Sequence, residues 1–243
     1  RQKQQWNSAY TPKNNKLIAD IKSGKLKGND VTRWKYQRYI KDYLRTIRAV
    51  DENVGRMLKY LDDTGLAKNT IVIYSSDQGF YLGEHGWYDK RWMFEESLAM
   101  PFLVRWPGMI PAGTESGTLI QNIDYGPTFL DIAKADIPPH MHGRSLLPAF
   151  KAPSRPPKNW RKSIYYAYYG ERTHQVAQHD GVRTGRHKLM FFPDTGEWNL
   201  FDLQKDPHEM QSLHADPGYA STLVEMQGLY TTQRSHFGVS DAT

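Results

Sequence analysis

The feature that most constrains the fold of this chain is a long amphipathic helix that leads directly into a buried strand. From Trp34 to about Gly65, apolar side chains recur at steps of three and four residues, as on one face of a helix. Residues 70–74 form a continuous, β-branched apolar run, which is typical of a strand covered on both faces. A helix that feeds such a strand indicates an α/β protein, so we predict a mostly parallel sheet with flanking helices.

The pattern changes near residue 150. A strand at residues 102–105 and a helix at 126–133 continue the α/β portion, whereas residues 151–162 are rich in proline and charge, as in a boundary loop. Beyond this loop we predict a small antiparallel sheet and a C-terminal helix, with strands at 163–169, 180–183, 187–192 and 198–202 and the helix at 219–235. The predicted division is therefore an α/β portion at residues 1–154 and a small antiparallel subdomain at 155–243.

Composition excludes several classes of protein and site. The longest apolar runs are of strand length, so none approaches the roughly 18–20 residues of a membrane span. Cysteine is absent, which excludes disulfides, thiolate zinc sites and a cysteine nucleophile. The net charge of +6 favours an anionic partner without identifying it. Since the chain opens with Arg1 and has no signal-peptide pattern, we interpret it as a fragment of a longer protein.

The densest group of reactive side chains follows the predicted buried strand, over residues 75–91. Ligands of open α/β sheets bind beyond the carboxyl ends of the strands, which places Asp77 and Gln78 at the ligand edge. A carboxylate beside an amide oxygen suits a hard cation such as calcium or magnesium. The residues alone leave one alternative open, an Asx turn that merely ends the strand.

Residues 70–91, 95–97 and 100–108 resemble the downstream half of the type I sulfatases of the alkaline phosphatase superfamily. The resemblance covers most of the chain and extends to Tyr43, Asp51 and Gly55 and to residues 124–128, 143–146, 181–184 and 203–209. The motif at residues 76–91 is similar to the branch that acts on sulfated glucosamine and other glycosaminoglycan-type sugars, including the N-acetylglucosamine-6-sulfatases. The resemblance implies the C-terminal part of an alkaline-phosphatase-like α/β sheet, a sulfuric ester hydrolase activity and a sulfated glycan substrate.

The resemblance also implies roles for particular residues. Asp77 and Gln78 match the pair that helps to bind a divalent cation, usually calcium, and Lys90 matches the lysine that contacts a sulfate oxygen. A cation and an ammonium beside a sulfuryl group would offset the charge that builds on its oxygens. Arg91 is expected to contact the substrate. His85 is expected either to contact the leaving group or only to brace its loop.

Two further histidines, His174 and His179, match a stretch that overhangs the pocket in glucosamine sulfatases, and the resemblance implies that they contact the substrate. This pair does not have the spacing of a recognised metal-binding motif, and neither does the pair His140 and His142. We therefore predict no zinc site.

The nucleophile of the family is a formylglycine made from the first residue of a Cys-or-Ser, x, Pro, x, Arg motif. Ser154 begins the nearest match, but Lys158 stands in place of the arginine and the segment follows Asp77, so we reject it. The resemblance therefore implies that the nucleophile, the remaining metal-binding aspartates and the general acid lie in a missing N-terminal segment. The fragment alone is expected to be inactive.

Two other functions remain open from the sequence. A phosphate or phosphonate ester hydrolase of the same superfamily would use the cation and Lys90 equally well. A non-catalytic module that binds acidic polysaccharide or nucleic acid would suit the positive charge, although no nucleic-acid-binding motif is present and we expect no such partner. The resemblance implies a periplasmic or secreted protein; a lysosomal origin gains no support, since the chain has no Asn-x-Ser/Thr acceptor.

Overall fold

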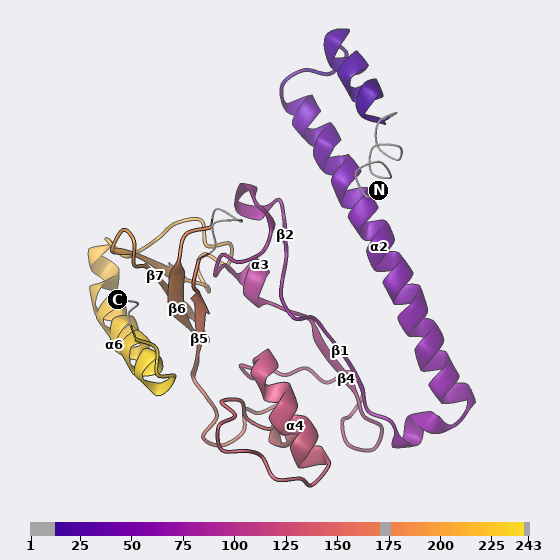
Figure 1. The fold of residues 1–243 in the computed structure, drawn as a ribbon, viewed down its shortest axis with the longest axis vertical. Helices are drawn as coiled ribbons and strands as arrows, with labels where there is room; N and C mark the ends of the chain where they lie inside the picture. The colour runs from indigo at the N-terminus through magenta and orange to yellow at the C-terminus, as the bar shows by residue number, and fades with distance from the viewer. Residues whose placement is uncertain (1–12, 171–175, 241–243) are drawn as a thin grey trace. The chain divides into compact units, whose positions relative to one another are not determined.

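The computed structural model describes residues 13–170 and 176–240. The chain divides after Thr64 into two compact units, residues 1–64 and 65–243 (Figure 1). No helix in the described part of the chain combines the length and the apolar character needed to cross a bilayer.

The first unit is helical. A helix at residues 13–22 precedes the 35-residue helix α2 (Asn29–Asp63) (Figure 1). The long helix predicted from Trp34 onward is therefore confirmed, with its start earlier, at Asn29. It stops before Gly65, whose φ of 73° lies in the left-handed region that favours glycine.

The second unit opens with the short helix η1 (Leu66–Asn69) and the strand β1 (Val72–Ser75). This strand pairs with β4 (Phe102–Arg105), which confirms both predicted strands. The pair is antiparallel, with Val72 opposite Arg105, although the sequence pattern predicted mostly parallel strands. Between them the chain forms only the two-residue strands β2 (Tyr81–Leu82) and β3 (Tyr88–Asp89) and the short helices η2 (Glu84–Gly86) and α3 (Glu95–Leu98). A parallel neighbour would usually need a longer crossover helix.

Two helices and a buried carboxylate follow this strand pair. The helix predicted at 126–133 is confirmed as α4 (Tyr125–Ile132), preceded by η3 (Asn122–Asp124) and followed by α5 (Leu147–Lys151). Asp124 is fully buried, and its oxygens accept the backbone N–H groups of Gln121 and Arg144, each at 2.8 Å. At Gly143 a Cβ atom would lie 1.9 Å from the carbonyl oxygen of Ile123, so only glycine fits there.

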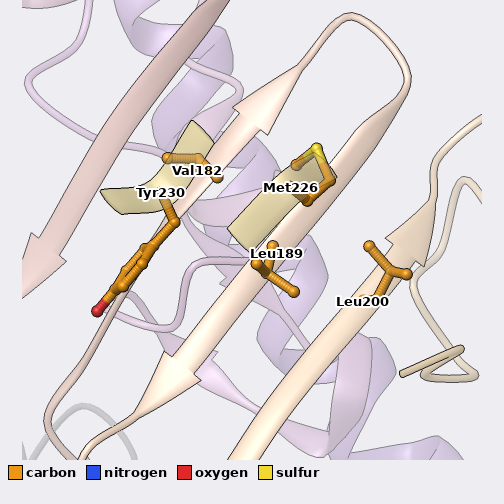
Figure 2. Packing of buried hydrophobic residues seen from close by; sticks show 5 residues of the cluster. All are labelled: Val182, Leu189, Leu200, Met226 and Tyr230. Carbon is orange, nitrogen blue, oxygen red and sulfur yellow. The ribbon is translucent and has the colours of Figure 1, made fainter. Parts of the chain in front are cut away.

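The predicted small antiparallel sheet is confirmed. Its strand order is β5-β6-β7-β8, formed by β5 (Ser163–Tyr168), β6 (His179–Thr184), β7 (His187–Phe192) and β8 (Glu197–Asp202). The chain then passes through η4 (Pro217–Tyr219) into the predicted C-terminal helix, α6 (Ala220–His236). The core between sheet and helix is a cluster of buried side chains from β6, β7, β8 and α6, namely Val182, Leu189, Leu200, Met226 and Tyr230 (Figure 2).

The predicted boundary at residue 154 falls in the loop between α5 and β5. Residues 65–243 nevertheless form one compact unit, and a buried charge network joins α3 to the small sheet. Lys188 has no exposed surface, and its Nζ atom lies 2.8 Å from Glu95 Oε1 and 2.7 Å from Glu209 Oε1. Burial disfavours the charged form of Glu95, but Arg183 and Lys188 outweigh it and hold the pKa of Glu95 below its ordinary value. The division into residues 1–154 and 155–243 stays a prediction.

Candidate active site

Four of the predicted site residues line one cavity of about 560 Å³ in the second unit. They are Asp77, Gln78, Lys90 and Arg91, all from the segment between β1 and α3. The other walls come from residues 120–123, from β5 and from the side chains of His142 and Phe237. The structure thus brings together a carboxylate, a side-chain amide and two cationic side chains around a space open to a ligand.

Asp77 and Gln78 occupy a turn held against α3. The N–H of Gly79 donates to the carbonyl oxygen of Ser97 at 2.8 Å, and a Cβ atom at Gly79 would lie 2.0 Å from the carbonyl oxygen of Glu96. Only glycine permits this close approach. The carboxylate of Asp77 is exposed, and its hydrogen bond is to the Ser76 hydroxyl, at 3.4 Å. It therefore does not close an Asx turn and remains available to a ligand.

The backbone on both sides of Lys90 is strained. Asp89 and Arg91 have φ angles of 100° and 104°, which non-glycine residues rarely adopt. Two side chains hold this conformation: the Tyr166 hydroxyl donates to the Arg91 carbonyl oxygen at 2.6 Å, and the Ser97 hydroxyl accepts from the Arg91 N–H at 3.2 Å. Arg91 also forms an ion pair with Asp89. Strain that is held in place in this way is typical of functional sites.

His179 does not contact the cavity, in contrast to the expected substrate contact. It is fully buried among Trp92, Tyr166 and Phe192. Its Nε2 atom accepts the N–H of Met93 at 3.1 Å, and Nδ1 lies 2.9 Å from the carbonyl oxygen of Ala177. Burial lowers the pKa of His179, so the ring is neutral and Nδ1 is the donor. The ring therefore fixes the backbone beyond Arg91.

His85 also lies away from the cavity lining. Its ring stacks on Phe94 with the centroids 4.1 Å apart, and its Nε2 atom lies 3.5 Å from Glu96 Oε2. Its φ of 54° places it at a turn of the loop between β2 and β3. This geometry favours the bracing alternative, and the role of His85 stays a prediction. His174 lies outside the described residues.

Asp77 and Gln78 fit a hard cation only as part of a larger ligand set. Over residues 13–170 and 176–240, no group of three or more histidine and acidic side chains is arranged to hold a metal ion. One carboxylate and one amide oxygen are suitable donors for calcium, but calcium binds about six to eight oxygens. The remaining ligands would have to come from elsewhere.

Sequence reasoning missed the residues that shape the far wall of the cavity and hold its backbone. Tyr166 lies in the predicted strand at 163–169, but only the register of the folded sheet reveals that its hydroxyl reaches Arg91. His142 and Phe237 are 95 residues apart in the chain, and their rings meet at 5.2 Å. No local pattern marks either of them.

Two family models match this chain. "N-sulphoglucosamine sulphohydrolase, C-terminal" matches residues 83–236, and "Sulfatase" matches residues 3–135. The chain belongs to the sulfatase family.

Two curated sulfatases and one solved structure match this chain over about half of its length or more. The N-acetylglucosamine-6-O-sulfatase of Bacteroides thetaiotaomicron is 45% identical over 234 residues, which is 95% of this chain and 41% of that protein. The human N-acetylglucosamine-6-sulfatase is 40% identical over 129 residues, 52% of this chain and 23% of that protein. The structure of BT4656 in complex with its substrate D-glucosamine-2-N,6-O-disulfate has a TM-score of 0.89 and 43% identity, over 97% of this chain and 47% of that one.

The match to BT4656 confirms the predicted fold class, the C-terminal part of an alkaline-phosphatase-like sulfatase fold. The chain spans less than half the length of these proteins.

Proposed function

We propose that this chain is the C-terminal portion of a sulfuric ester hydrolase that removes sulfate from amino-sugar glycans of the glycosaminoglycan or mucin type. The observation that carries the proposal is the cavity in which Asp77, Gln78 and Lys90 converge, with Lys90 presented by a backbone strained on both sides. The similarity to N-acetylglucosamine-6-sulfatases over 95% of the chain supports the sugar class.

The side chains suit the transfer of a sulfuryl group. The Lys90 ammonium would donate to a sulfuryl oxygen, and its positive charge would stabilise the charge that develops there. Asp77 and Gln78 would supply two oxygen ligands to calcium, or to magnesium in its place, and the cation would polarise the same group. Arg91, whose guanidinium pairs with Asp89, lies beside Lys90 and would orient the sulfated sugar.

A preceding segment of the same protein would complete the site. This chain has no cysteine and no Cys-or-Ser, x, Pro, x, Arg motif, so the formylglycine nucleophile, further cation ligands and the general acid would come from that segment. The compartment proposed is periplasmic or secreted, on the family resemblance. Recovery of the native protein from the cytosolic fraction of its source cells would contradict it.

The experiment compares two esters of the same sugar. The complete protein, supplied with calcium, is assayed on N-acetylglucosamine-6-sulfate and on N-acetylglucosamine-6-phosphate. We expect sulfate release, and we expect Lys90→Ala to lower kcat/KM by roughly 100-fold, since the charge on the transferred group loses a partner. Lys158→Ala, at an exposed lysine of the loop before β5, is the matched control. Faster turnover of the phosphate ester would instead support the phosphate ester hydrolase.

A further inference from the structure

A second, smaller hollow of about 230 Å³ adjoins the cavity at Lys90. The two share the lining residues Gln121, His142 and Phe237, so they are next to each other in the second unit. The ionisable side chains that line the hollow are His142, Arg144, Arg161 and His236. We call this feature the basic hollow, because none of its described lining residues is acidic.

Arg161 lines the basic hollow and is held in place by a buried carboxylate. Its guanidinium donates two hydrogen bonds to the buried Asp124, at 2.5 and 2.6 Å, and also lies over the Trp160 ring. The charge of Arg161 is therefore already matched from the protein interior. Arg161 therefore helps to shape the basic hollow, and the positive charge that attracts an anionic ligand must come from another side chain.

Arg144 supplies the positive charge in the basic hollow that can pair with an anionic ligand. Its backbone N–H is anchored on Asp124, while its side chain is exposed and donates to the carbonyl oxygen of Asn159 at 3.0 Å. In the part of the chain that the structure describes, no carboxylate lies within ion-pair distance of this guanidinium. A guanidinium with remaining donors matches the geometry of sulfate and carboxylate oxygens.

We infer that the basic hollow binds a second anionic group of the glycan substrate, a sulfate or a carboxylate, while the scissile sulfate lies at Lys90. This inference rests on the proposed function and extends it, because it makes the enzyme selective for glycans that have an anion beyond the one removed. The second anion has two possible sources, an N-sulfate on the same glucosamine or the carboxylate of an adjoining uronic acid. His142 and His236 would add hydrogen bonds to either group.

The test measures substrate preference in the complete protein with and without Arg144→Gln. Three substrates are compared: N-acetylglucosamine-6-sulfate, N,6-disulfated glucosamine, and a disaccharide in which a uronic acid adjoins 6-sulfated N-acetylglucosamine. We expect Arg144→Gln to raise the KM of a dianionic substrate, relative to that of the monosulfated sugar, about threefold to tenfold. The substrate whose ratio changes identifies the source of the second anion.

The matched control is Arg155→Gln, which removes a charge from an exposed arginine in the loop between α5 and β5. If Arg144→Gln leaves both ratios unchanged, or changes them no more than Arg155→Gln does, the inference is wrong. If the protein hydrolyses none of the three sugars, the proposed function is wrong. In that case their affinities, measured by calorimetry with the same variants, still decide whether the hollow prefers a second anion.

Discussion

Lys90 owes its position in the cavity to hydrogen bonds that neighbouring elements make with the backbone beside it. The positive φ angles of Asp89 and Arg91 cost on the order of 1–3 kcal/mol each. Two hydrogen bonds at Arg91 offset this strain: the Tyr166 hydroxyl donates to its carbonyl oxygen, and its N–H donates to the Ser97 hydroxyl. His179 holds the next part of the backbone by accepting the N–H of Met93. Ser97 of α3 and two side chains of the small sheet, Tyr166 and His179, therefore determine the geometry of the loop around Lys90.

Replacing Tyr166 by phenylalanine tests this arrangement. The variant loses the hydrogen bond to the Arg91 carbonyl oxygen but keeps the ring, so we expect kcat of the complete protein to fall about tenfold as Lys90 shifts. Burial raises the pKa of Tyr166 to about 12, so the hydroxyl remains a donor across the whole assay range. The expected loss is therefore the same from pH 6 to pH 9.

The control for this variant is Tyr169→Phe, at a tyrosine that is 73% exposed on the same segment. Thermal melts of both variants separate misplacement of Lys90 from loss of folding. Equal kcat values in the two variants would show that Lys90 keeps its position without the hydrogen bond from the Tyr166 hydroxyl.

Asp77 provides a second test at this scale. We expect Asp77→Ala in the complete protein to weaken calcium affinity and to lower kcat roughly 100-fold, because a charged ligand is removed from the cation. The fold should persist, since the carboxylate is exposed and, among the residues that the structure describes, is bonded only to the Ser76 hydroxyl. Calcium titration of activity is the measurement, and Asp194→Ala, at an exposed aspartate of the turn between β7 and β8, is the control. Unchanged calcium dependence in Asp77→Ala would exclude this cation site.

Whether a site residue could be predicted depended on its distance in sequence from the motif. Asp77, Gln78, Lys90 and Arg91 lie in one loop after a recognisable strand, so a local motif was enough to place them together. The burial of His179 was not predictable, because it depends on the register that places Tyr168 opposite it in the folded sheet.

At the scale of elements, local patterns predicted the positions of helices and strands, but not the direction in which β1 and β4 pair. The short strand patterns and the Gly and Pro turns between them predicted the positions of β5 to β8 and of the helix α6 closely, because each signal lies within the element or its turn. The antiparallel pairing of β1 with β4 was missed, since the direction of a pair depends on the route of the chain between its strands.

Asp202 joins three elements and should make the small sheet sensitive to acid. It accepts from Arg186 at 3.0 and 2.7 Å and from the Tyr219 hydroxyl at 2.9 Å, which links the end of β8 to the β6–β7 turn and to η4. The hydrogen bonds from Arg186 hold the pKa of Asp202 well below its ordinary value. A lowered folded-state pKa contributes stability above about pH 4, and this contribution is lost as the pH falls toward the folded-state pKa.

We therefore expect Asp202→Asn to lower the free energy of unfolding by about 1–3 kcal/mol at pH 7. Between pH 4 and pH 2, the free energy of unfolding should fall less in this variant than in the parent protein. Urea unfolding of the complete protein at several pH values measures this. Asp206→Asn is a nearby control, at a carboxylate bonded to the N–H of Gln211. Parallel stability curves for Asp202→Asn and the parent protein would rule out a charge effect at Asp202.

At the scale of the whole molecule, the chain has some of the groups that the proposed sulfuryl transfer needs, together with apolar side chains on α2 that the rest of the first unit leaves exposed. Leu44 and Met57 on α2 are 55% and 68% exposed. Large exposed apolar side chains on an amphipathic helix indicate a surface that packs against further protein. The proposed preceding segment would supply such protein along with the nucleophile.

Activity should depend on this division of the reacting groups between two segments. A nucleophile, a cation and a general acid must converge on one sulfur atom, and removing one member of such a set lowers the rate by orders of magnitude. We expect residues 1–243 alone, with calcium, to release no sulfate from N-acetylglucosamine-6-sulfate or from an aryl sulfate, and to aggregate more readily than the complete protein. Adding the preceding segment with its formylglycine should restore turnover, whereas the same segment with alanine at that position should not. Calcium-dependent sulfate release by a verified 243-residue chain would mean that the nucleophile lies within these residues, with a serine as the only candidate of the family type, because the chain has no cysteine.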